Sequence, residues 1–102
     1  MNPIILSHQS ELETLCRRYR VGRLALFGSA ARGDFELARS DIDFLVAFQP
    51  LSPTEHADAY FGLLMALEDL FQRPIDLVEE GASRNPFFLQ TVAQSSALLY
   101  AA

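Results

Sequence analysis

Two short polar motifs interrupt apolar segments of this 102-residue sequence, and both carry residue types suited to phosphate or metal chemistry. The first motif is Gly28-Ser29, which directly follows the apolar run 24–27. Such a run, ending in Gly and a small polar residue, is typical of a short buried strand that enters a tight turn. If a short helix begins after the turn, its unpaired backbone N–H groups and its dipole attract anions. Gly28 and Ser29 are therefore candidates for holding the phosphates of a nucleotide.

The second motif, Asp41-Ile42-Asp43, opens another apolar run. Residues two apart on a strand point to the same face, so this spacing places two carboxylates side by side. Like charges at that separation repel, and a hard divalent cation with oxygen ligands, Mg²⁺ above all, commonly offsets the repulsion. A turn after a strand, or two solvated aspartates, would each be ordinary alone. Their occurrence together and in this order indicates a functional site.

The flanking sequence predicts the elements that position these motifs. A first helix is expected to begin near Ser7 or Ser10, because Ser10 and Glu13 form a capping-box pattern, and to end at Gly22. Strands are expected at 24–27 and 42–48. A second capping box begins at Ser52, and we expect a long helix from there to about residue 72.

A third short strand is expected at 74–78, and strand–helix–strand spacing of this kind favours a parallel crossover. Asp43 and Asp76 would then lie at the same end of the sheet. If the first strand runs antiparallel to the second, Gly28 and Ser29 lie there too. The predicted fold is α+β, with a small mixed sheet, helices on one of its faces, and three carboxylates beside an anion-binding turn at one end.

The last part of the chain gives two further expectations. Asn85 and Pro86 read as the cap and first residue of a final helix, which should turn Phe88, Leu89 and Val92 inward. The apolar tail 97–100 either packs back on the domain or forms a surface for a partner, and the pattern alone leaves both alternatives open.

Composition predicts a single domain over residues 1–102 and excludes several classes of function. No apolar run approaches the roughly 18 residues of a membrane helix, and no charged-then-apolar leader is present. With a single cysteine, Cys16, an internal disulfide is impossible, so we expect a cytoplasmic protein. The net charge of −5 argues against direct binding of nucleic acid. The sequence has no lysine, which excludes a phosphate-binding P-loop, and its two distant histidines do not indicate a zinc site.

The two motifs resemble those of minimal nucleotidyltransferase domains of the DNA polymerase β superfamily. In that family Gly-Ser at a strand end, usually followed by Ala-Arg-Gly, precedes Ser-Asp-x-Asp at the start of the next strand. The corresponding segments here are 28–33 and 40–43, and the resemblance spans nearly the whole chain. The loop 34–39 is longer than the family pattern by one residue, which leaves both motifs intact.

The resemblance implies a polymerase-β-like fold and transfer of a nucleotidyl group from a nucleoside triphosphate, assisted by two Mg²⁺ ions. In this reading Asp41, Asp43 and Asp76 are the catalytic residues and metal ligands, and Asp76 also helps to deprotonate the incoming hydroxyl. The triphosphate is held by Gly28 and Ser29. For Arg32 two roles stay open, neutralising phosphate charge or pairing with an acidic residue.

The resemblance also implies a partner. Free-standing domains of this family are commonly antitoxins encoded beside a HEPN-domain ribonuclease toxin, and some silence it by transferring AMP from ATP to a toxin tyrosine. A hetero-oligomer with such a toxin is therefore expected. Two alternatives remain: a non-catalytic antitoxin or binding subunit that acts by contact alone, and a receiver-like phosphoacceptor domain. The second would need a lysine late in the chain, and the sequence has none.

Overall fold

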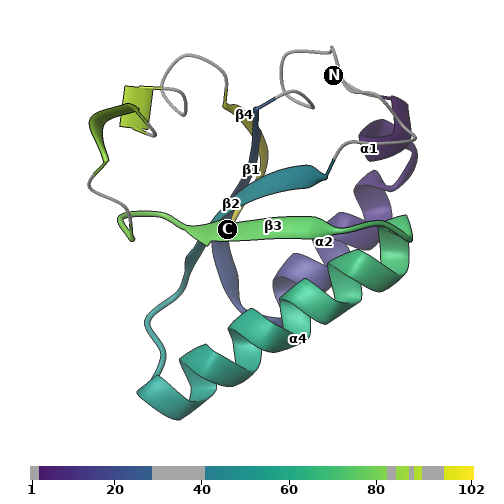
Figure 1. The fold of residues 1–102 in the computed structure, drawn as a ribbon. Helices are drawn as coiled ribbons and strands as arrows, with labels where there is room; N and C mark the ends of the chain where they lie inside the picture. The colour runs from purple at the N-terminus through teal and green to yellow at the C-terminus, as the bar shows by residue number, and fades with distance from the viewer. Residues whose placement is uncertain (1–2, 29–40, 83–84, 88, 91–95) are drawn as a thin grey trace.

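Seven helices and strands are defined in the computed structural model, which describes residues 3–28, 41–82, 85–87, 89–90 and 96–102 (Figure 1). They are α1 (Pro3–Ser7), α2 (Gln9–Arg18), β1 (Val21–Phe27), β2 (Ile42–Phe48), α4 (Pro53–Phe71), β3 (Ile75–Glu79) and β4 (Ala97–Ala101). No helix among the described residues is long and apolar enough to cross a membrane.

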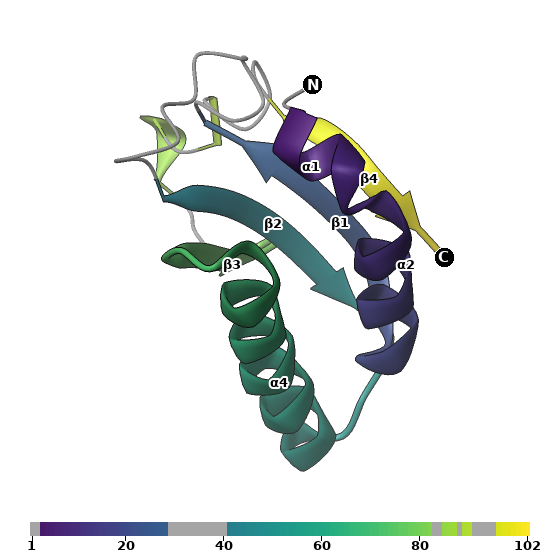
Figure 2. The same cartoon turned by 90° about the vertical axis from the view of Figure 1, so that its right-hand side faces the viewer.

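The strands form one mixed sheet in the order β3-β2-β1-β4. As expected from the crossover spacing, β3 pairs with β2 in parallel, and β1 pairs antiparallel with both β2 and β4. The helices α2 and α4 lie on the same face of this sheet (Figure 2). The predicted α+β fold, with a small mixed sheet and helices on one face, is therefore confirmed.

The long helix α4 begins and ends where its sequence predicts. The backbone N–H of Glu55 donates to Ser52 Oγ at 3.3 Å, and Ser52 N–H donates to Glu55 Oε1 at 3.2 Å, which completes the capping box. Pro53 occupies the first turn, where its missing N–H costs nothing. Gln72 closes the helix in the left-handed conformation, with φ of 55°. Residues on one side of α4 are buried, namely Ala59, Leu63, Leu67 and Phe71.

The first helical segment differs from its prediction. Helix α2 begins at Gln9, its N-cap residue is His8, and no side chain caps it, so the expected box at Ser10 and Glu13 does not form. The reason is that residues 3–7 already form α1, so the chain enters α2 from a helical turn rather than from an extended segment. The prediction that Gly22 ends this helix is also wrong, because the helix stops at Arg18 and Gly22 lies inside β1.

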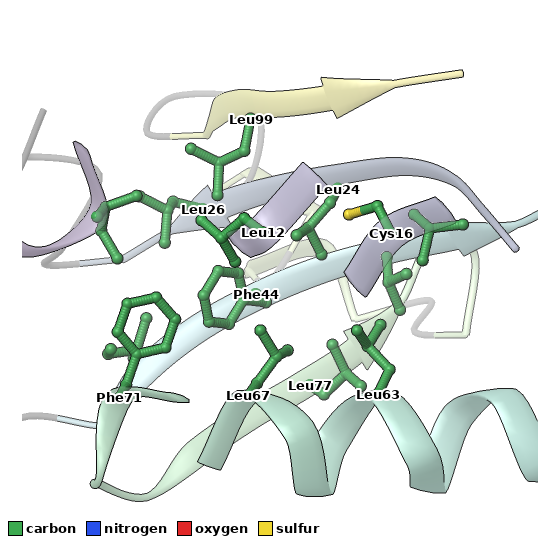
Figure 3. Packing of buried hydrophobic residues seen from close by; sticks show 14 residues of the cluster. Leu12, Cys16, Leu24, Leu26, Phe44, Leu63, Leu67, Phe71, Leu77 and Leu99 are labelled. Atoms are coloured by element: carbon green, nitrogen blue, oxygen red, sulfur yellow. The ribbon is translucent and has the colours of Figure 1, made fainter. Parts of the chain in front are cut away.

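The main hydrophobic core lies between the sheet and the helices. Phe44 and Val46 of β2, Leu24 and Leu26 of β1, and residues of α2 and α4 pack in one cluster (Figure 3). Burying a large apolar side chain of this kind stabilises the fold by about 1.5–3 kcal/mol relative to leaving it exposed. The cluster holds the inner face of the sheet against the helices, so, within the sheet, only the opposite face and the strand ends remain for function.

The C-terminal tail packs back on the domain as β4, with Leu99 in the main core. The expected final helix is only partly described. Residues 86–87 and 89–90 are helical, and Asn85 Oδ1 accepts from Phe87 N–H at 2.9 Å, as expected for a cap. Leu89 is half exposed instead of inward. Phe88 and Val92 lie outside the described residues.

Candidate active site

The ends of three neighbouring strands bring the predicted site residues together. In the register of the sheet, Asp43 on β2 pairs with Asp76 on β3 and with Phe27, the last residue of β1. Gly28 directly follows Phe27, and Asp41 directly precedes β2. Four of the six predicted site residues therefore lie at the same end of the sheet. Ser29 and Arg32 lie outside the described residues.

Strand alternation separates the carboxylates from the core. The β2 residues Ile42 and Phe44 are buried against the helices, so Asp43 points to the opposite face. A second, smaller apolar cluster covers that face next to Asp43, and it consists of Ala25, Phe27 and Leu45 with Val78 packed against it. This cluster was not predicted. The sequence did indicate this cluster, because Leu45 follows Asp43 by two residues in β2 and therefore points to the same face.

Gly28 lies directly against the carboxylate of Asp43. Its φ is +71°, a conformation that residues with a side chain rarely adopt. A Cβ atom at Gly28 would lie 2.6 Å from Asp43 Oδ2, closer than real Cβ contacts. Glycine is therefore required here for two reasons, the backbone conformation and the space that the carboxylate occupies. The turn after β1 and the carboxylate of β2 consequently form one packed unit.

Asp43 lies close to two other carboxylates at this end of the sheet. Partial burial, with added repulsion from Asp76 and then Asp41, raises the pKa of Asp43 to about 6. Asp41 and Asp76 are both exposed. A carboxylate in this position holds its proton more tightly than usual because burial, and then two neighbouring carboxylates, disfavour its charged form.

The donor set fits a hard cation such as Mg²⁺, because three carboxylates supply oxygen ligands and their repulsion would be relieved by positive charge. Within the described ranges, however, no three His, Cys, Asp or Glu side chains form a group that could hold a metal ion. The residue types and their placement at one strand end are thus suited to a metal, while their side chains are not gathered into a metal centre.

Tyr60 of α4 supports this end of the molecule and was not among the predicted site residues. Its hydroxyl donates to the backbone carbonyl of Leu77 at 2.6 Å, one residue after Asp76. Burial, with nearby Glu79 and Asp76, raises the pKa of Tyr60. The hydroxyl therefore stays protonated and ties α4 to the strand that carries Asp76. Its only signal in the sequence was the hydroxyl group of a tyrosine among the apolar residues of the long helix.

Comparison with known proteins identifies the family. The sequence model of the nucleotidyltransferase domain matches residues 10–99. The chain belongs to the nucleotidyltransferase domain family. Among relatives of this family, "Putative protein adenylyltransferase MJ0128" of Methanocaldococcus jannaschii is 34% identical over 91 residues, which cover 89% of this chain and 86% of the relative.

Two solved structures illustrate the similarity of the fold. A structure described as a "putative minimal nucleotidyltransferase" is 31% identical, has a TM-score of 0.70, and is matched over 91% of this chain and 90% of its own. A toxin–antitoxin structure with AMP-PNP has a TM-score of 0.67 at 24% identity, over 92% of this chain and 73% of its own. At that identity the second likeness supports the fold alone. The nucleotidyltransferase fold is thus common to both.

Proposed function

We propose that this nucleotidyltransferase is a Mg²⁺-dependent protein adenylyltransferase and an antitoxin, which transfers AMP from ATP to a tyrosine of a HEPN-type toxin. The observation that carries the proposal is the pairing of Asp43 with Asp76 in the register, directly against the turn at Gly28. The relatives named as protein adenylyltransferases support the choice of acceptor class, and the toxin–antitoxin neighbour supports the choice of partner.

In the proposed reaction the tyrosine oxygen attacks the α-phosphorus of ATP. A new P–O bond forms, the bond from the α-phosphorus to the bridging oxygen breaks, and pyrophosphate leaves. Asp41, Asp43 and Asp76 would hold two Mg²⁺ ions, whose positive charge stabilises the attacking and leaving oxygens. Asp76 would also take the tyrosine proton. Gly28 and Ser29 would orient the triphosphate through backbone N–H groups, and Arg32 would neutralise phosphate charge.

The test is incubation of the chain with α-labelled ATP, Mg²⁺ and the protein encoded by the neighbouring gene. Asp43→Asn should abolish label transfer because it removes a ligand at the centre of the carboxylate group. Glu13→Gln is the matched control, since Glu13 is a partly exposed acid on α2, away from the candidate site. Its transfer should equal that of the wild type.

Intact mass of the partner separates the two antitoxin mechanisms. Co-expression with the wild-type chain should add the mass of AMP to the partner, and co-expression with Asp43→Asn should not. A stable complex in which the wild-type chain adds no AMP would contradict the proposal and leave the non-catalytic antitoxin as the better account.

A further inference from the structure

A furrow runs between α2 and α4 on the helical side of the molecule. It consists of two adjoining cavities of about 400 Å³ and about 260 Å³, and Arg18 of α2 lines both. We call it the α2–α4 furrow. The side chains that line it include Leu15 and Arg18 of α2 and Asp58, Ala66, Asp69 and Leu70 of α4.

Apolar side chains line part of the furrow and stand next to its α4 wall. Leu15, Ala66 and Leu70 line the larger cavity, together with polar side chains of both helices. On α4, Met65 is 68% exposed and Phe61 is 60% exposed. These two residues are four apart, so they lie on the same side of α4. Met65 is one turn from the lining residue Asp69, and Phe61 is one turn from the lining residue Asp58. Adjoining exposed apolar side chains beside a cavity are typical of an interaction surface.

The α4 wall is acidic, whereas the α2 wall carries both signs of charge. On α2, Glu11 lines the larger cavity and lies 4.0 Å from His8. Arg18 lies on the α2 wall, and Asp58 and Asp69 lie on the α4 wall. The ion pairs found among the described residues involve none of these three. The charges therefore remain available to an occupant, which should present a basic flank to α4 and an acidic side chain opposite Arg18.

A second copy of the chain fits this pattern poorly. Helix α4 contains no Lys or Arg, and its exposed side carries Asp58, Glu68 and Asp69 around Phe61 and Met65. Packing two such helices together would bring acid against acid, and the net charge of −5 on each copy opposes association further. The wall charges favour a different protein with basic residues on one flank.

We propose that the α2–α4 furrow binds an amphipathic helix of a partner protein. The occupant has apolar residues at helical spacing to fill the furrow between Leu15 and Met65, a basic flank against α4, and an acid opposite Arg18. The helices that form the furrow lie on one face of the sheet (Figure 2), whereas Asp43 points to the other face and Asp76 lies beside it in the register, so an occupied furrow leaves the candidate active site open. This inference therefore stands independently of the proposed reaction.

The test uses a labelled helical peptide of about 18 residues, or five turns, titrated with the full chain and followed by fluorescence anisotropy. The peptide carries leucines along one face, lysines on one flank and glutamates on the other. A second peptide keeps the leucines but has glutamate on both flanks. The first should bind at least about tenfold more tightly, because only it complements the acids of α4. Equal affinities, or no binding of either peptide, would overturn the proposal.

Variants of the chain identify the surface. Arg18→Glu and Met65→Ser should each weaken binding of the first peptide by about tenfold. Arg17→Glu makes the same charge change one residue away, outside the cavity lining, and should alter the affinity by less than about twofold. All three positions are exposed, and thermal melting checks that each variant folds. An equal loss in Arg17→Glu, or a dimer of the wild-type chain in sedimentation that Met65→Ser dissociates, would contradict the proposal.

Discussion

The charged carboxylate of Asp43 opposes folding, although the proposed reaction requires it. Partial burial and two neighbouring carboxylates raise its pKa to about 6 from an ordinary value of 3.8. Because the folded state holds this proton more tightly, the group contributes stability that is fully present below its ordinary pKa. That contribution is lost as the pH rises through about 6. In the absence of metal, the charged carboxylate therefore destabilises the fold at neutral pH.

Asp43→Asn should accordingly stabilise the metal-free protein at pH 7.5. A pKa shift of one unit corresponds to about 1.4 kcal/mol, and partial exposure reduces the effect, so we expect a gain on the order of 1 kcal/mol. The advantage over wild type should shrink as the pH falls from 7 to 4, where the wild-type carboxyl becomes protonated. Thermal melting of both proteins with EDTA at pH 7.5 and pH 4.5 measures it. A variant less stable than wild type at both pH values would show that the carboxylate makes favourable contacts instead.

Alanine variants of Gly28 and Gly81 distinguish the effect of backbone strain from the effect of contact with the Asp43 carboxylate. Both have positive φ, +71° and +83°, but a Cβ at Gly28 would strike Asp43, whereas one at Gly81 would meet nothing within 4 Å. Each alanine variant should lose about 1–2 kcal/mol of unfolding free energy from strain. Only Gly28→Ala should also lose transfer activity, because it displaces the Asp43 carboxylate. Transfer assays and melting of both variants are the measurement, and equal activities would mean that the close packing of Gly28 on Asp43 has no role.

At the scale of elements, the two predicted capping boxes differ in the backbone conformation of the serine itself, which must be extended for the box to form. Ser52 has φ of −65° and ψ of 160°, and its box forms. Ser10 lies inside α2, after α1 has already begun the helical segment, and makes no cap. Both boxes look alike in the sequence. What distinguishes them is the packing of Ile5, which is 1% exposed and holds α1 on the core, and this tertiary contact is not visible in a local pattern.

The difference gives a matched pair of variants. Ser52→Ala should reduce the free energy of unfolding by about 1 kcal/mol, since it leaves the N–H of Glu55 without its acceptor. Ser10→Ala should change it by less than about 0.5 kcal/mol, because the position is exposed and makes no cap. Urea unfolding of both variants checks the pair. A comparable loss in both would mean that the Ser10 box does form.

The strands that carry the site could be predicted from the sequence, whereas β4 could not. Periodicity and spacing correctly predicted β2, α4, β3 and the parallel crossover, so the common end of Asp43 and Asp76 followed from the sequence. In β4 the register shifts between the pairs that involve Tyr100 and Leu98, which breaks the period of two. A five-residue edge strand without regular alternation has no clear local signal, so only the sheet itself reveals it.

At the scale of the whole molecule, hydrogen bonds connect the last residues of the chain to α2 and β1. Gln9 Nε2 of α2 donates to the Leu99 carbonyl at 3.3 Å, and Ala102 N–H donates to the Gly22 carbonyl at 2.9 Å. Leu99 enters the main core at 8% exposure, whereas its neighbour Leu98 is 57% exposed. The tail is thus part of the fold on one side and available for contacts on the other.

Adjacent leucines of β4 therefore test how far the global stability depends on this last strand. Leu99→Ala should cost about 2–4 kcal/mol, because it removes buried methyl groups and leaves a cavity where α2, β1 and β4 meet. That is a large fraction of the roughly 5–15 kcal/mol by which a domain is stable, so the melting temperature should fall strongly. Leu98→Ala should cost less than about 0.5 kcal/mol, since most of its side chain is already in contact with water. Chemical denaturation of the two variants compares them directly. If Leu99→Ala were as mild as Leu98→Ala, β4 would be only loosely attached, and the tail would be better described as a free surface for a partner than as part of the core.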